Sequence, residues 1–334
     1  MVPPIYSPRE DRYENGMRYR RCGKSGIFLP EVSLGLWHNF GDVDLLATSL
    51  KKAHYAFDHG ITHFDLANNY GPCYGSAEET FGVIMEKSFR PYRDELFIST
   101  KAGHDMWPGP YGNWGSRKYL FASLEQSLKR MKLDYVDIFY SHRYDPETPI
   151  EETLQALVDI VRQGKALYVG ISKYPKDKAE FAYKYLAENK VPCLLYQGRY
   201  NIFNREPEEE GILDSAKANG SGFIAFSPLA QGLLTDRYLG GIPEDSRVAR
   251  GGFLKKEALT DATIEKVRKL NEVAQRRGQT LAEMALAWVL KDDLVTSVII
   301  GASSVEQIER NLKAINNTTF SASELEEINN IYKS

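Results

Sequence analysis

The chain has 334 residues, of which 43% are hydrophobic and 26% charged, with a formal net charge of -3. This composition is typical of a folded globular protein. The charge argues against a nucleic-acid surface, and no apolar run is long enough for a transmembrane helix or a signal peptide. Three widely separated cysteines (Cys22, Cys73 and Cys193) predict no disulfide framework and favour a reducing, cytoplasmic setting.

The N-terminal part predicts a loose arm over residues 1–16 and a β-hairpin over residues 17–30. From there, short apolar runs alternate with helical patterns as far as the C-terminus. Eight of these runs predict strands: 32–36, 62–66, 96–100, 136–140, 167–171, 194–197, 223–226 and 297–300.

Apolar residues at helical spacing predict the intervening helices, which lie at 45–59, 117–131, 150–161, 179–186, 211–218, 281–290 and 305–314. A further helix opens at Ser76, which we expect to be its N-cap because Glu79 follows at the spacing of a capping box. Eight strands that alternate with helices predict an α/β fold, a closed (β/α)8 TIM barrel. We therefore expect one barrel domain over residues 17–334.

Two segments do not fit this alternation of strands and helices. Residues 229–279 are too long for an ordinary βα loop and contain a predicted helix at 261–276, which indicates a lid or a cofactor clamp. Residues 321–331 predict an extra C-terminal helix with a capping box at its start.

Ionisable side chains follow three neighbouring predicted strands. Asp65 lies at the end of the second strand and Tyr70 in the loop after it, Lys101 ends the third, and His142 ends the fourth. A strand-end Asp or Lys is more often a structural ion pair than a catalyst, but the active site of a barrel lies at these ends. A lysine would lower the pKa of the phenol, and a buried carboxylate would hold that lysine charged. The set would then donate a proton to a carbonyl that receives hydride.

These four residues match, in order and strand placement, the catalytic tetrad of the aldo-keto reductase superfamily, which the chain resembles over roughly residues 17–331. It resembles most the branch of the bacterial L-glyceraldehyde 3-phosphate reductases and the potassium-channel β-subunits. The motifs that carry this likeness lie at 140–143, 165–172, 227–235, 241–247 and 298–303. The channel subunits carry Asn where this chain has His142, which favours a working reductase.

The resemblance implies NADPH as cofactor, bound without the Rossmann glycine fingerprint, which the chain lacks. Ser172 and Gln197 would hydrogen-bond the nicotinamide carboxamide, and Phe226 would stack on the ring unless it is an ordinary core aromatic. Arg247 would meet the 2′-phosphate unless it is a solvated loop charge, and Arg310 stands where relatives often have Glu. The other implied cofactor contacts are Trp37, Asp65, Ser227, Leu229, Gln231, Gly232, Arg237, Gly301, Ser303, Gln307 and Asn311.

The expected substrate is a small aldehyde such as L-glyceraldehyde 3-phosphate or methylglyoxal. Its pocket would include Trp37, Tyr70, Trp107, His142 and Arg143, with Tyr111 and Trp114 as further candidates. Arg143 suits an anionic group such as a phosphate. The aromatic residues 107–114 fit a pocket wall and an oligomer contact equally well.

Other functions stay open at this point. A nucleotide-sensing regulatory subunit is the main alternative. A metal-dependent hydrolase would need ligand spacings that the sequence lacks. Cys73, three residues from Tyr70, is either a redox site or a passive small residue. Analogy with the family predicts a homo-oligomer, either a tetramer or an octamer.

Overall fold

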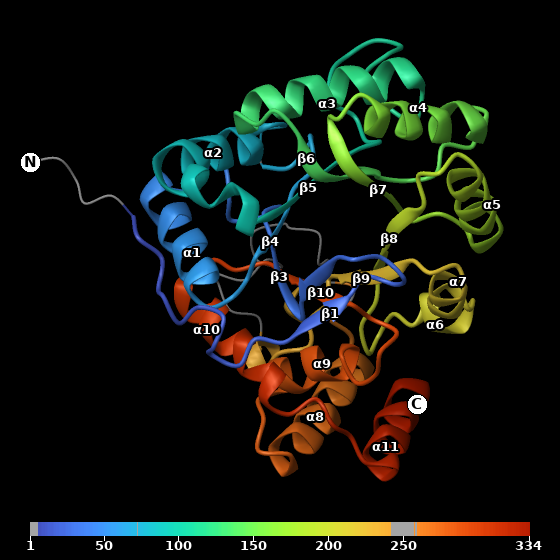
Figure 1. Ribbon diagram of the computed structural model, residues 1–334. Helices are drawn as coiled ribbons and strands as arrows, with labels where there is room; N and C mark the ends of the chain where they lie inside the picture. Colours follow the sequence, from blue (N-terminus) through green and yellow to red (C-terminus); the bar gives the residue numbers. More distant parts are fainter. Residues whose placement is uncertain (1–5, 72, 242–256, 258) are drawn as a thin grey trace, which may run out of the picture.

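The computed structural model describes residues 6–71, 73–241, 257 and 259–334. Its centre is a closed parallel barrel with the strand order β10-β3-β4-β5-β6-β7-β8-β9 (Figure 1). All eight predicted strands are therefore confirmed. Their bounds are β3 Val32–Gly35, β4 His63–Asp65, β5 Phe97–Ala102, β6 Val136–Ser141, β7 Ala166–Ser172, β8 Cys193–Arg199, β9 Gly222–Phe226 and β10 Ser297–Ile300.

Helices surround the barrel, and several of them pack directly against its strands (α3 on β5, α4 on β7, α5 on β8 and α7 on β9), whereas α11 packs on α8. Their bounds are α1 Leu46–Asp58, α2 Ser76–Ile84, α3 Arg117–Met131, α4 Ile150–Arg162, α5 Lys176–Glu188, α6 Glu206–Glu209, α7 Ile212–Ala218, α8 Asp261–Arg276, α9 Leu281–Val289, α10 Val305–Leu312 and α11 Ala322–Lys333. The predicted (β/α)8 barrel is confirmed. The short α6 was not predicted, because a run rich in Glu has no apolar periodicity.

The capping box predicted at Ser76 is wrong. Gly75, with a φ of 93°, is the N-cap of α2 and provides no side-chain cap, so Ser76 is already the first helical residue. Glycine suits this left-handed conformation. The capping box predicted for the C-terminal helix is confirmed at Ser321 and Glu324.

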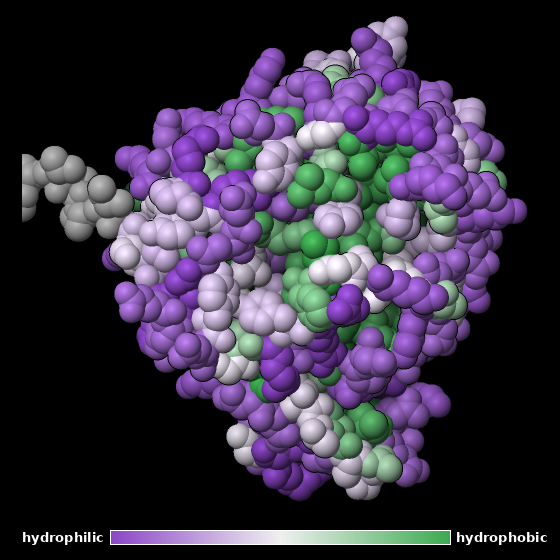
Figure 2. All heavy atoms as spheres, in the orientation of Figure 1, coloured by the Kyte–Doolittle hydropathy of each residue, from purple (hydrophilic) through white to green (hydrophobic). Residues whose placement is uncertain are grey.

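The predicted N-terminal hairpin is confirmed as β1 (Tyr19–Arg21) and β2 (Phe28–Pro30). It closes the end of the barrel where the strands begin: a Cβ placed on Gly222, the first residue of β9, would lie 3.2 Å from the Cα of Cys22. Figure 1 shows the hairpin across the near end of the barrel, and apolar side chains are visible on that face in Figure 2. The hairpin therefore leaves the opposite end, where the strands finish, as the place for a site.

The N-terminal arm, described from Tyr6 onward, lies against α1. The Tyr6 ring stacks on His54 with 3.8 Å between the ring centroids, and its hydroxyl donates to Asp58 at 2.8 Å. Farther along, Arg12 forms an ion pair of 2.5 Å with Glu95. These contacts hold the described part of the arm to the outside of the barrel.

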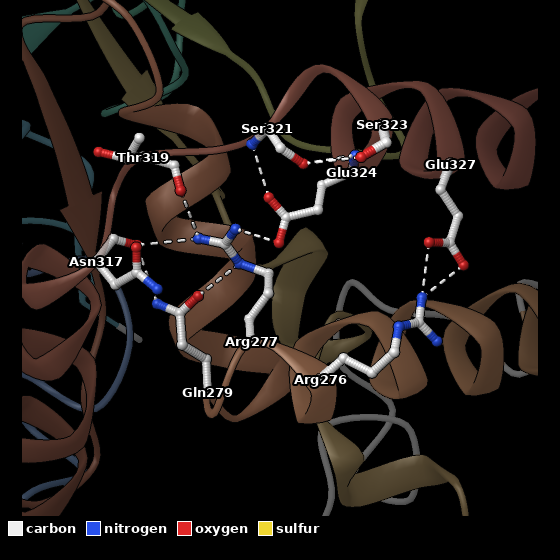
Figure 3. Close-up of polar contacts among 9 residues, drawn as sticks. All are labelled: Arg276, Arg277, Gln279, Asn317, Thr319, Ser321, Ser323, Glu324 and Glu327. Carbon is white, nitrogen blue, oxygen red and sulfur yellow. Dashed lines mark hydrogen bonds and ion pairs between the residues drawn. The ribbon is translucent and has the colours of Figure 1, made fainter.

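A polar network holds the C-terminal helix in place (Figure 3). The Arg277 guanidinium pairs with Glu324 at 2.8 Å, donates to the carbonyl of Thr319 at 3.0 Å, and lies 3.7 Å from the centroid of the Phe320 ring. Next to it, Arg276 pairs with Glu327 at 2.6 Å. The turn after α8 therefore holds the start of α11. Among the described helices, none is both long and apolar enough to cross a membrane.

The barrel interior has an apolar side and a polar side. Inward-facing residues of β6, β8 and β9, such as Ile138, Leu195 and Ile224, form an apolar cluster with residues of the hairpin. On the side of β3 and β4, the fully buried His63 contacts the hydroxyls of Ser33 at 2.8 Å and Ser99 at 3.1 Å. Burial lowers the pKa of His63 from 6.5 to about 4, Asp65 opposes this shift, and Lys101 reinforces it.

This shift predicts a loss of stability in acid. Between pH 6.5 and 4 the unfolded chain protonates His63 and the folded chain does not, so the free energy of unfolding falls as the pH falls. For the shift from 6.5 to about 4, the loss is about 3 kcal/mol. Urea unfolding at a series of pH values should show that His63→Gln is less sensitive to acid over this range. Equal slopes for the two proteins would contradict the prediction.

Candidate active site

The four predicted catalytic residues gather at the carboxyl ends of adjacent strands. Asp65 is the last residue of β4, Lys101 is the last but one of β5, and His142 directly follows β6. These strands are neighbours in the barrel, so their ends bring the three side chains together. Tyr70 joins them from the loop after β4, where its ring centroid lies 4.8 Å from the Lys101 Nζ.

Asp65 and Lys101 form a buried ion pair. The Lys101 Nζ donates to Asp65 Oδ2 at 2.7 Å and to the carbonyl of Leu66 at 2.5 Å. Asp65 Oδ1 accepts from the Ser99 hydroxyl at 2.7 Å and from Gln197 Nε2 at 3.1 Å. Burial lowers the pKa of Lys101, and the Asp65 carboxylate opposes that shift. The pair thus has the hydrogen bonds that a buried charge needs.

The pKa of Tyr70 is raised well above 10, first by burial and then by the Asp65 carboxylate. The expectation that Lys101 would give this phenol a lowered pKa is therefore wrong. The physical reason is that desolvation disfavours the phenolate more than the neighbouring cation favours it. Tyr70 consequently holds its proton at neutral pH, which is the state that a proton donor requires.

His142 is buried beside Tyr70, with 5.9 Å between their ring centroids. Its pKa lies well below 6.5, because of burial and then of the cations at Lys173 and Lys101. The imidazole is therefore neutral. Its Nδ1 is buried and makes no hydrogen bond to the described residues. A neutral imidazole with an unused nitrogen is suited to a hydrogen bond with a ligand.

Arg143 lies on the outer side of His142. Its Nε donates to the Gly103 carbonyl at 2.7 Å, its Nη2 donates to Asn113 Oδ1 at 2.8 Å, and its guanidinium lies 3.6 Å from the Trp114 ring centroid. These two bonds use only two of its five N–H groups. The loop after β5 therefore holds a cation beside the tetrad.

The other predicted pocket aromatics divide into two groups. Trp37 lies near the tetrad, 6.1 Å from the Tyr70 ring. Trp107 packs on Tyr119 of α3 at 5.1 Å, and Tyr111 is exposed near Lys118. Only Trp37 and Trp114 therefore have ring contacts with Tyr70 or Arg143, and Trp107 stays a prediction as a substrate contact.

The predicted nicotinamide contacts lie across the barrel from Tyr70. Ser172 at the end of β7 and Gln197 of β8 are buried partners in the strand register, and Phe226 ends β9. The Ser172 hydroxyl is buried and has no hydrogen-bond partner among the described residues. A hydroxyl in this state fits a carboxamide ligand, because an unpaired buried polar group is costly.

The loop after β9 has an unusual backbone. Ser227, Ala230 and Gln231 all have positive φ angles, between 47° and 60°, and Gly232 follows at 98°. Such conformations are costly for residues other than glycine and cluster at ligand sites. The buried Gln231 Oε1 also has no partner among the described residues. Leu229 precedes the short helix of this loop, and Arg237 lies within the next one, Asp236–Tyr238.

The remaining predicted cofactor residues surround the start of α10. The backbone N–H of Ser303 donates to Gln307 Oε1 at 2.8 Å, and Asn311 is buried one turn later. A Cβ on Gly301 would meet no atom within 4 Å, so the backbone there is open to a ligand. Arg310 lies in the last turn of α10. Arg247 lies outside the described residues.

Two residues near the tetrad were missed. His104 stands edge-on to His142 at 4.5 Å, and its Nε2 lies 3.4 Å from the Lys173 Nζ. Lys173 also lies 5.5 Å from the Phe226 ring centroid. Their only sequence signal was their place just after the ends of β5 and β7. Cys73 is exposed, and the pKa of its thiol is raised through a hydrogen bond with Asp42, which argues against a reactive thiolate.

At one end of the barrel, a buried Asp–Lys pair, a phenol and a neutral imidazole lie side by side, a set that can give a proton to a carbonyl oxygen. The Aldo/keto reductase family model matches residues 31–333. The chain belongs to this family, whose members use a nicotinamide cofactor.

Two groups of relatives match nearly the whole chain. It is 58% identical to the L-glyceraldehyde 3-phosphate reductase of Escherichia coli K12 over 328 residues, which is 97% of this chain and 94% of the relative. It is 37% identical to a probable voltage-gated potassium channel subunit beta of Arabidopsis thaliana over 306 residues, or 90% and 91% of the two chains. Both kinds of protein in the branch predicted from the sequence are thus confirmed as relatives.

Proposed function

We propose that the protein is an NADPH-dependent reductase of small aldehydes, with L-glyceraldehyde 3-phosphate as the first candidate and methylglyoxal as the second. The observation that carries this proposal is the position of the Tyr70 phenol, whose ring lies beside the buried Lys101–Asp65 pair. The 58% identity to a reductase, against 37% to a channel subunit, supports catalysis over the alternative of a regulatory subunit.

The four residues of the site have different roles in this reaction. His142 donates a hydrogen bond to the carbonyl oxygen and orients the aldehyde. Tyr70 then gives its proton to that oxygen, and the Lys101 cation stabilises the phenolate that remains. Asp65 holds Lys101 in place. Bound NADPH supplies hydride to the carbonyl carbon.

The unpaired polar atoms of Ser172 and Gln231 support a dinucleotide site on the far side of the barrel mouth. Ser172 and Gln197 would hold the carboxamide, and Phe226 would cover the nicotinamide ring. The residues from Ser227 to Gly232 would follow the phosphates. The adenosine end would lie at Gly301, Ser303, Gln307 and Asn311, with Arg237 and Arg247 as candidate phosphate contacts.

A panel of aldehydes, each assayed with NADPH and with NADH, tests the proposal. We expect oxidation of NADPH on addition of L-glyceraldehyde 3-phosphate, and a higher kcat/KM with NADPH than with NADH. Tight NADPH binding with no turnover of any aldehyde would instead favour the regulatory subunit. We also propose a cytoplasmic homo-oligomer, a tetramer or an octamer, and elution as a monomer in size-exclusion chromatography would contradict it.

Arg143 provides a prediction about substrate charge. Its unused N–H groups suit a phosphate, so Arg143→Leu should raise the KM for L-glyceraldehyde 3-phosphate about tenfold, since a charge-assisted hydrogen bond contributes about 1.5 kcal/mol or more. The KM for uncharged methylglyoxal should change less than twofold. Steady-state kinetics with both aldehydes measure the difference, and an equal rise for both would show a general packing effect.

A further inference from the structure

A row of polar side chains lies inside the barrel behind Asp65 and crosses four adjacent strands. The hydroxyls of Ser297 on β10 and Ser33 on β3 are 2.6 Å apart. Ser33 contacts His63 Nδ1 at 2.8 Å, His63 Nε2 contacts the Ser99 hydroxyl at 3.1 Å, and Ser99 contacts Asp65 Oδ1 at 2.7 Å. All five side chains are buried. The row therefore ends on the carboxylate that holds Lys101.

In this row, each side chain donates a hydrogen bond to the next one toward Asp65. Asp65 is a carboxylate and can only accept, so the single proton of Ser99 points to Asp65 Oδ1. Ser99 must then accept from His63, which places the imidazole proton on Nε2. Because the imidazole is neutral, Nδ1 accepts from Ser33, and Ser33 in turn accepts from Ser297. The order of donation is Ser297, Ser33, His63, Ser99, Asp65.

The neutral state of His63 agrees with its surroundings. Burial lowers its pKa to about 4, and the charged groups that shift it, Asp65 and Lys101, act in opposite directions. The remaining ring contact of the imidazole is with Phe97 of β5, at 5.5 Å and nearly perpendicular. Apolar side chains would fill the same space without needing partners. Burying these polar side chains therefore costs free energy, and the hydrogen bonds among them offset that cost.

We propose that His63 and Ser99 are positioning residues that fix the orientation of the Asp65 carboxylate for the reaction. Oδ1 is held by Ser99 and Gln197, which leaves Oδ2 directed at the Lys101 Nζ. Gln197 is expected to contact the nicotinamide, so its bond to Asp65 competes with the cofactor, whereas the bond from Ser99 does not. Ser99, oriented by His63, therefore holds the carboxylate throughout turnover. This inference rests on the proposed reductase function.

A matched pair of substitutions separates this role from packing. Glutamine at position 63 can place its amide N–H where the His63 Nε2 lies, and so can still donate to Ser99. Asparagine is shorter and reaches only the position of Nδ1, which faces Ser33. His63→Asn should lower kcat about tenfold, because small errors of placement are costly in catalysis. The KM for aldehyde and the Kd for NADPH should stay within twofold. His63→Gln should keep kcat within threefold of the natural protein. Ser99→Ala should resemble His63→Asn, and the double variant should lose little more than either alone.

The outcomes are distinct. Full kcat in both His63→Asn and Ser99→Ala would overturn the proposal. Equal losses in His63→Asn and His63→Gln, together with equal falls in Tm, would show a packing role and would also overturn it.

A measurement independent of turnover keeps the inference testable if the natural protein reduces no aldehyde. Nitrogen-15 NMR of the histidine side chains, with His63→Gln for assignment, should show a neutral His63 with its proton on Nε2 from pH 5.5 to 8. A proton on Nδ1 would reverse the row and refute the positioning role, whereas the absence of activity alone would refute only the proposed function.

Discussion

Tyr70→Phe is expected to lower kcat for aldehyde reduction by about 10²–10⁴-fold, the range for loss of a general acid. The phenol is the proton donor placed beside Lys101, whose Nζ lies 4.8 Å from its ring centroid. Phenylalanine keeps the ring and its contacts with Trp37 and His142, so NADPH binding and Tm should stay close to those of the natural protein. Single-turnover kinetics at saturating NADPH give the rate of the chemical step directly.

The matched control is Tyr19→Phe. The Tyr19 hydroxyl donates to the Gly60 carbonyl at 2.7 Å from the hairpin that closes the opposite end of the barrel. Its removal tests for a general cost of losing a half-buried, hydrogen-bonded tyrosine hydroxyl, and kcat should not change. If Tyr70→Phe kept more than a tenth of the activity, another group would have to supply the proton.

The sequence predicted the strands and most helices because their apolar patterns are strong, and most residues of the barrel strands are buried. Its failures are local. Ser76 and Glu79 have the spacing of a capping box, but Gly75 takes the left-handed conformation before them and starts the helix one residue early. The short α6 is rich in Glu, and a spacing rule cannot find it.

The sequence predicted the site residues that have suitable ionisable side chains and also lie at the ends of neighbouring strands. Asp65, Lys101 and His142 lie at the carboxyl ends of consecutive strands, so the barrel had to bring them together. The direction of the pKa shift of Tyr70 was not predictable, since it depends on how completely the phenol is desolvated. His104 and Lys173 were missed because their place near His142 follows from loop conformation, including a positive φ of 55° at Lys173.

The buried pair of Asp65 and Lys101 predicts a second large effect. Lys101→Met removes the cation and leaves Asp65 uncompensated at 2% side-chain exposure. The free energy of unfolding should fall by about 3–5 kcal/mol, the usual cost of leaving one partner of a buried ion pair. Urea unfolding at pH 7 measures this loss. Reduction of aldehydes should also be lost, because nothing then stabilises the phenolate of Tyr70.

The double variant Asp65→Asn/Lys101→Met separates stability from catalysis. Asparagine has no charge and can still accept from Ser99 through its carbonyl oxygen, so the double variant should recover at least half of the stability lost in Lys101→Met. It should recover no activity, because the cation is still absent. If the double variant were as unstable as Lys101→Met, the loss would come from the bond between Lys101 and the Leu66 carbonyl rather than from the buried charge. Restored turnover would contradict the role of Lys101 in the reaction.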